Sequence, residues 1–217
     1  MYDIAMLAHL LVYGGAAVAS LPLLFFTIRA IIRKQWHKLR KIVITTAVVA
    51  LTAKVGMTLL HKAVGREYSA GVYDVSIDVD DPIFEYDSER SIHGDGYSIS
   101  VYALPDSIRE RFEAADDRLT SQFPKLPSYR NKWKVIRWQK TPLDPSHQNY
   151  LAFAGSTYDA ERSDGLPAHL GAMRDALSRE GSFYAFLKFD HGSSPGNIDF
   201  FVVDLKGGKL YEINHNT

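Results

Sequence analysis

Two long apolar segments dominate the N-terminal part of the chain. They run from Ile4 to Ile28 and from Ile42 to Leu60, and they contain 25 and 19 residues. A membrane-spanning helix needs about 20 apolar residues, because each residue rises about 1.5 Å and the hydrocarbon layer is about 30 Å thick. Both segments are close to this length. We therefore predict two transmembrane helices, over residues 4–28 and 42–60.

A strongly basic turn separates the two segments. Residues 29–41 contain six basic side chains and no acidic one: Arg29, Arg33, Lys34, Lys38, Arg40 and Lys41. Lys and Arg beside transmembrane helices are retained on the cytoplasmic side. The pattern predicts a multi-pass protein of the cytoplasmic membrane. Residues 1–64 would form a hairpin with a cytoplasmic turn, and residues 65–217 a domain on the outer side.

The first apolar segment also has an alternative interpretation as a cleaved signal peptide. Ala17-Val18-Ala19 before Ser20 has the small-x-small form of a cleavage site. However, the residues before the apolar segment include Asp3 and no base, and the segment continues beyond the site to Phe26. A signal peptide has a basic start and a shorter apolar region, so the pattern favours a retained helix.

Charge divides the chain near residue 66. Up to Arg66 there are nine Lys or Arg residues and one acid, a net charge of +8; from Glu67 there are 16 bases and 24 acids, a net charge of −8. An acidic outer domain would be repelled by a phosphate backbone, which argues against a nucleic-acid partner. The chain has no cysteine. A periplasmic domain must then be stabilised by its own core, which about 150 residues can supply.

The outer domain shows short alternating segments and two helical periodicities. Val75, Ile77 and Val79 alternate with polar residues, as in a half-buried strand. Strands are predicted over residues 72–79, 97–104, 133–140, 150–155, 183–190, 198–205 and 210–213, and helices over residues 106–119 and 167–180. Polar loops are expected at residues 80–96, 141–148 and 156–166. The order predicts an α+β domain, an antiparallel sheet with two helices on one face.

The first candidate binding segment is acidic. Six carboxylates occur within twelve residues: Asp78, Asp80, Asp81, Glu85, Asp87 and Glu89. The start of the group is similar to a calcium loop, but Ile83 occupies the position where such a loop requires Gly. We assign Asp78, Asp80, Asp81, Glu85 and Asp87 to a surface for a cationic partner. The alternatives are a calcium site and a solvated loop.

The second candidate segment is basic and aromatic. Residues 125–140 contain six bases, three aromatic residues and no acid. Aromatic and Arg side chains are enriched where partners are anchored. We assign partner contacts to Lys132, Trp133, Lys134, Arg137 and Trp138. The alternatives are an edge strand whose lysines discourage pairing, with one Trp in the core, and contact with anionic lipid.

One ionisable residue lies within a predicted membrane helix. Lys54 is the thirteenth residue of the segment 42–60, where a charge costs roughly 2.5–3.5 kcal/mol. In a hairpin, Lys54 would face the small residues Gly14 and Gly15, which allow helices to approach closely. The segment could then contact another membrane helix. The alternative is that Lys54 extends to the headgroups.

The sequence shows no pattern typical of an active site. No Gly-x-Ser-x-Gly turn surrounds Ser156, Ser193 or Ser194, and the histidines lack the spacing of zinc ligands. We therefore expect a protein that is not an enzyme and that holds no cofactor or metal.

A two-helix anchor carrying a small, cysteine-free, acidic domain is similar in outline to immunity proteins of the bacterial inner membrane. This resemblance implies a binding module whose periplasmic domain captures a protein partner, an antibacterial toxin. The alternative is an accessory or sensor subunit of an envelope complex for secretion, transport or signalling, assembled through the hairpin. An enzyme acting on the envelope is the third hypothesis. The sequence does not indicate the oligomeric state.

Overall fold

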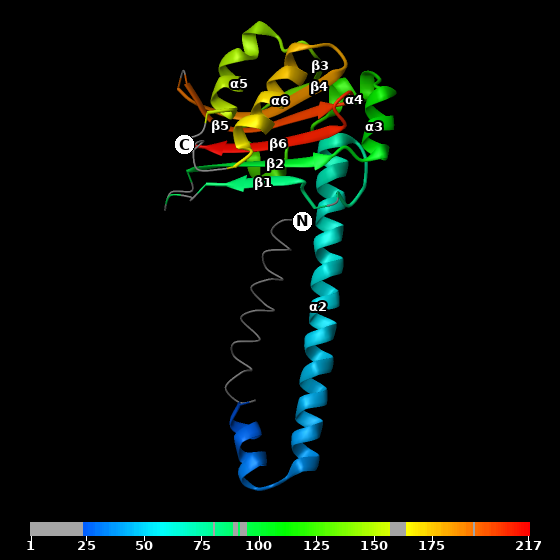
Figure 1. Ribbon diagram of the computed structural model, residues 1–217, viewed down its shortest axis with the longest axis vertical. Coiled ribbons are helices and arrows are strands. Elements are labelled where there is room, and N and C mark those ends of the chain that lie inside the picture. The colour runs from blue at the N-terminus through cyan, green and yellow to red at the C-terminus, as the bar shows by residue number, and fades with distance from the viewer. Residues whose placement is uncertain (1–23, 80, 89–90, 92–94, 157–163, 193) are drawn as a thin grey trace. The chain divides into compact units, whose positions relative to one another are not determined.

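The computed structural model describes residues 24–79, 81–88, 91, 95–156, 164–192 and 194–217 (Figure 1). The chain divides into two compact units, Met1–Arg66 and Glu67–Thr217. The boundary between the units falls within helix α2, which runs from Trp36 to Tyr73.

The first unit contains helical residues 24–32 and most of α2. Between them, residues 33–35 form a turn in which Lys34 has a positive φ of 52°. Among the described residues, α2 is the one helix that is long and apolar enough to cross a membrane. It contains the predicted span 42–60, whereas most of the predicted helix 4–28 lies outside the described residues. A single candidate span is therefore what the structure supports.

Helix α2 is longer than the sequence pattern predicted. Its 38 residues correspond to about 57 Å at the usual rise per residue. It continues to Tyr73, so the predicted strand at residues 72–79 is wrong. Residues 75–79 have no regular secondary structure. Val75 and Ile77 pack against the core, and the Ile77 backbone N–H and carbonyl bond the Ser69 hydroxyl. The alternation reflects one-sided packing without strand pairing.

The second unit contains a six-stranded antiparallel sheet with the strand order β1-β2-β6-β5-β4-β3 (Figure 1). Its strands are β1 (Phe84–Asp87), β2 (Gly96–Ala103), β3 (Lys134–Lys140), β4 (Ser182–His191), β5 (Ser194–Asp204) and β6 (Lys209–Asn216). The predicted mixture of helices with an antiparallel sheet is confirmed. Strands β5 and β6 occupy the centre, while β1 and β3 form the two edges.

Helices cover both faces of the sheet, so the prediction of two helices on one face is wrong. They are α3 (Asp106–Glu113), α4 (Asp117–Gln122), α5 (Gln148–Ala154) and α6 (Leu166–Ser178), with short 3-10 turns at Ser128–Arg130 and Pro145–His147. One core contains residues of α5 and α6, and the other contains residues of α3, α4 and the end of α2. The reason lies in β4, where Phe183 and Ala185 belong to one core and Tyr184 and Phe186 to the other.

Three local predictions also need correction. Residues 84–87 were expected in a loop but form β1, because Phe84 and Tyr86 alternate with exposed acids and pack against the core. Residues 150–155 were expected as a strand, but residues 150–154 belong to α5, which buries its apolar side against the same core. The predicted helix 106–119 is two helices, because Asp116 caps a new one through the Leu119 N–H.

Candidate functional site

The two charged segments lie at opposite edges of one sheet. The basic segment leads into β3 at one edge, and the acidic segment contains β1 at the other edge. They therefore form two separate surfaces of the second unit.

Two of the predicted partner contacts on β3 serve the fold. Trp138 is only 1% exposed, and its Nε1 donates a hydrogen bond of 2.8 Å to the Val72 carbonyl. Arg137 donates to the carbonyls of Gln122 and Pro124. Because a buried side chain cannot anchor a partner, we remove Trp138 from the candidate surface. Arg137 holds the segment before β3 in place.

Trp133 is also held inside the unit. It packs against the core that contains residues of α3, α4 and the end of α2, and the Arg130 guanidinium lies 3.9 Å from the centre of its ring. Arg130 in turn pairs with Asp199, which also accepts a 2.6 Å hydrogen bond from the Asn214 amide. Burial raises the pKa of Asp199, and the Arg130 charge opposes this effect. Arg130 and Trp133 thus have structural partners.

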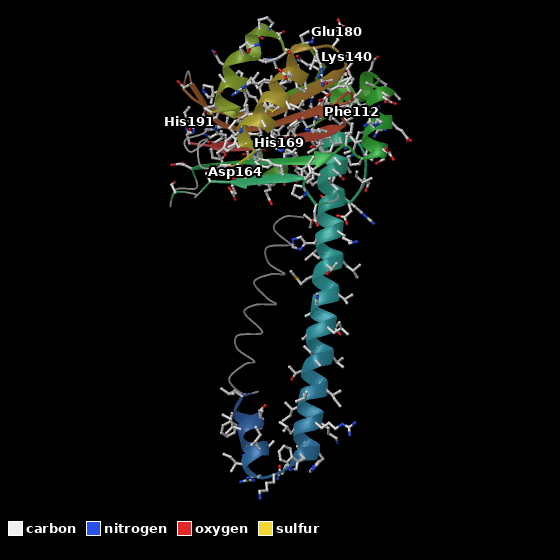
Figure 2. All side chains as sticks on the ribbon, in the orientation of Figure 1. Phe112, Lys140, Asp164, His169, Glu180 and His191 are labelled. Carbon is white, nitrogen blue, oxygen red and sulfur yellow. The ribbon has the colours of Figure 1, made fainter. Side chains whose placement is uncertain are left out.

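Three lysines of the same segment have no ion pair within the described part of the unit. Lys132, Lys134 and Lys140 are exposed, and none of them has an ion pair with another described residue (Figure 2 labels Lys140). We call these three residues the lysine edge. The division follows from chemistry, because the planar Arg fork suits several acceptors whereas Lys is a flexible, strongly hydrated point charge. The difference between Arg and Lys was therefore the signal in the sequence that separates the structural residues from the exposed ones.

The acidic segment is exposed where it is described, and it does not form a metal site within the described part of the chain. Asp78, Asp81, Glu85 and Asp87 are exposed, whereas Asp80 and Glu89 lie outside the described residues. No group of three side chains able to hold a metal ion occurs among the residues that the structure describes.

The predicted membrane contact is only partly described. Lys54 is exposed within α2, and Gly14 and Gly15 lie outside the described residues. Contact of Lys54 with another membrane helix therefore stays a prediction.

The serine and histidine candidates are not paired with one another where they are described. The Ser156 hydroxyl donates to the Phe153 carbonyl, and His215 Nδ1 lies 2.8 Å from the same oxygen. His169, labelled in Figure 2, stacks on Phe84 with ring centres 4.3 Å apart. Ser193 lies outside the described residues. Ser156, His215 and His169 thus have local structural partners.

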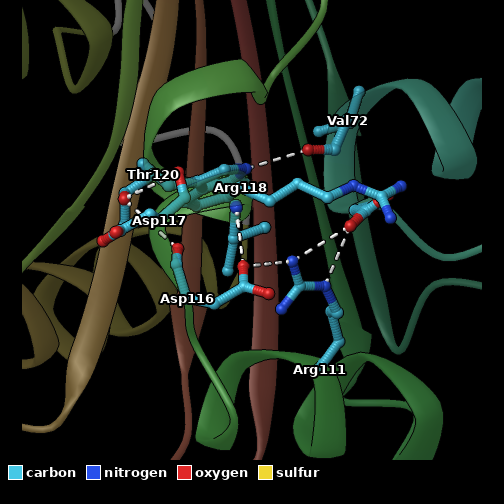
Figure 3. A network of polar contacts seen from close by, with 9 residues as sticks. Val72, Arg111, Asp116, Asp117, Arg118 and Thr120 are labelled. Atoms are coloured by element: carbon cyan, nitrogen blue, oxygen red, sulfur yellow. Dashed lines mark hydrogen bonds and ion pairs between the residues drawn. The ribbon is translucent and has the colours of Figure 1, made fainter.

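The sequence pattern did not indicate a polar network at the end of α2 (Figure 3). Asp74 accepts hydrogen bonds of 3.0 Å from Arg111 Nε and 2.6 Å from Arg118 Nη2. Arg111 also donates to Asp116, the residue that caps α4. The Arg111 guanidinium and the Leu119 N–H hold the pKa of Asp116 below its usual value. The network connects the residue that follows α2 to α3 and α4.

A second polar cluster joins α2 to the central strand β6. The Tyr73 hydroxyl donates to Glu212 Oε1 over 2.5 Å, and the Tyr68 hydroxyl to Oε2 over 3.1 Å. Burial raises the pKa of Glu212, and the two hydroxyl hydrogen bonds oppose this rise. Both tyrosines belong to the last turns of α2, so the carboxyl group lies where the helix meets the sheet.

The last carbonyls of α2 receive donors from the segment that leads into β3. The Gly71 carbonyl accepts from the Lys125 N–H over 2.8 Å, and the Val72 carbonyl accepts from Trp138. Terminal carbonyls have no partner within their own helix, so these bonds act as a C-cap from another part of the chain.

Comparison with known proteins identifies no relative. No protein-family model, curated protein or solved structure matches the chain.

The raised pKa of Glu212 predicts how stability depends on pH. The folded state binds its proton more tightly than the unfolded state, so the stability from Glu212 is full below the unfolded pKa of about 4.5 and is lost as pH rises through the folded pKa. Glu212→Gln cannot ionise. Relative to wild type, we expect this variant to gain on the order of 1 kcal/mol in free energy of unfolding between pH 4 and pH 8.

Denaturation of the full chain in detergent at both pH values, followed by tryptophan fluorescence, measures this gain. Glu85→Gln on the exposed edge β1 is the matched control and should show no such gain. A constant difference between Glu212→Gln and wild type across the pH range would contradict the assignment.

Proposed function

We propose that the chain is a bacterial inner-membrane binding module whose outer domain captures a protein partner. In this proposal, residues 1–64 form a two-helix hairpin with its basic turn in the cytoplasm, and residues 65–217 lie in the periplasm. The apolar helix α2 and the short turn at residues 33–35, which follows the helical residues 24–32, support the hairpin. The charge of residues 29–41 supports its orientation.

The main support for partner capture is the exposure of the lysine edge. The arginines of this segment are used by the fold, whereas Lys132, Lys134 and Lys140 remain exposed without an internal acid among the described residues. Lys134 and Lys140 lie on the edge strand β3 and Lys132 lies two residues before it, in a unit with a net charge of −8. A cationic surface on an acidic domain selects and steers an anionic partner.

The most concrete partner is an antibacterial toxin, which would make the chain an immunity protein. Support comes from the outline of the chain, a membrane anchor with a small cysteine-free domain. Because this resemblance is one of outline alone, isolation of the partner itself is the test of the toxin hypothesis.

An accessory or sensor subunit of an envelope complex is the second candidate function. The continuity of α2 favours it, because the helix runs unbroken from Trp36 to Tyr73 and its last turns contribute core residues to the second unit. A simple anchor would function equally well with a flexible linker. An envelope-acting enzyme is the third hypothesis and has no paired nucleophile and base among the described residues to support it.

The proposed topology predicts opposite results from two reporter fusions. Alkaline phosphatase, which is active only outside the cytoplasm, should be active when fused after Thr217 and inactive when inserted at Trp36, because the basic turn is retained inside. A reporter active only in the cytoplasm provides the control at both positions. Activity of alkaline phosphatase at Trp36 alone would contradict the orientation.

The proposed capture predicts that a specific protein copurifies with the tagged full chain from its native membrane. Because exposed charges contribute, recovery should fall several-fold as the salt concentration rises from about 0.05 to 0.5 M. An unrelated two-helix membrane protein with the same tag is the control. A captured toxin supports the immunity protein, and captured envelope subunits support the second function. No enrichment over the control at any salt concentration would refute partner capture.

A further inference from the structure

Two lysines lie directly opposite one another at the β3 edge. In the antiparallel register of β3 and β4, Lys134 is the partner of Lys188. Opposite residues of neighbouring strands place their side chains on the same face about 5 Å apart, and like charges there are unfavourable. The two lysines differ in the contacts that the rest of the unit provides for them.

Lys188 has a complete set of internal partners. Its Nζ lies 2.8 Å from Asp190 Oδ2, donates to the Tyr150 hydroxyl and lies 4.0 Å from the centre of the Tyr150 ring. Tyr150 also donates to Asp190. An ammonium group on this face is therefore satisfied by one carboxylate and one tyrosine. Lys134 has neither among the described residues.

The backbone limits where a partner can reach this edge. The Trp138 N–H donates to the Phe123 carbonyl, and Arg137 holds the neighbouring carbonyls. The second half of β3 is therefore covered by its own chain. The first half, Lys134–Ile136, has no such cover among the described residues, and Lys132 lies two residues before it.

We propose that Lys132 and Lys134 dock a carboxylate-bearing, extended segment of the partner along the first half of β3. This inference rests on the proposed function and names the chemistry of the captured surface. The pairing of Lys188 with Asp190 shows the carboxylate contact that Lys134 lacks. An edge strand also offers backbone donors and acceptors, which an extended peptide can match and a lipid headgroup cannot.

The test uses the full chain in nanodiscs of zwitterionic lipid and two fluorescent ten-residue peptides. One peptide alternates Glu with Thr, and the other alternates Lys with Thr. We expect the acidic peptide to bind wild type and the basic peptide to bind at least about tenfold more weakly. Lys134→Glu should weaken the acidic peptide about five- to tenfold, and Lys134→Gln should weaken it less.

Lys206→Glu is the matched control. Lys206 is exposed in the turn between β5 and β6 and does not belong to the lysine edge. We expect less than a twofold change for this variant. Equal binding of the acidic peptide to wild type and Lys134→Glu would overturn the proposal, as would equal weakening by Lys134→Glu and Lys206→Glu.

Two further outcomes separate the alternatives. If Lys134→Glu weakens binding to phosphatidylglycerol vesicles but not to the acidic peptide, the lysines serve lipid and the inference is wrong. In the capture experiment, equal recovery of the partner by wild type and Lys134→Glu would overturn only this inference. Failure of both proteins to capture any partner would overturn the proposed function.

Discussion

The second unit depends on the packing of the last turn of α2 into one of its two cores. Tyr73 is fully buried, and the centre of its ring lies 5.8 Å from that of Trp138, 6.5 Å from Phe112 and 6.4 Å from Phe201. Aromatic side chains of this size dominate the energetics of a core. The polar groups around Tyr73 are satisfied at the same time, since its hydroxyl bonds Glu212 and the Val72 carbonyl bonds Trp138. The helix end is therefore a structural element of the second unit.

This packing also explains which charges remain for function. Trp138 and Arg137 are needed where β3 passes the end of α2 and the segment before it, and Arg130 is needed beside Asp199. Removing any of these groups would leave buried acceptors or a buried charge without a partner, which costs more than an exposed contact contributes. The three residues of the lysine edge have no ion pair with another described residue, so they can contact a partner at little cost to folding.

The sequence predicted the elements whose pattern is set by local periodicity. The strands around Tyr97, Trp138, Phe186 and Phe200 and the helix around Met173 occur close to where they were expected. It failed where burial is decided by distant parts of the chain: residues 150–154 pack as a short helix, and α2 ends at Tyr73 because Lys125 and Trp138 cap it. The basic segment was located correctly, but its division into structural arginines and exposed lysines requires knowledge of Asp199 and of the carbonyls before β3.

Hydrogen–deuterium exchange of the full chain in nanodiscs tests the role of the helix end most directly. If the last turn of α2 belongs to the core, amides of residues 70–73 should exchange as slowly as those of the central strand β5, because both open only with the whole unit. Exchange of residues 70–73 as fast as that of the exposed turn at residues 206–208 would contradict this account, since it would show a helix end that opens independently of the sheet.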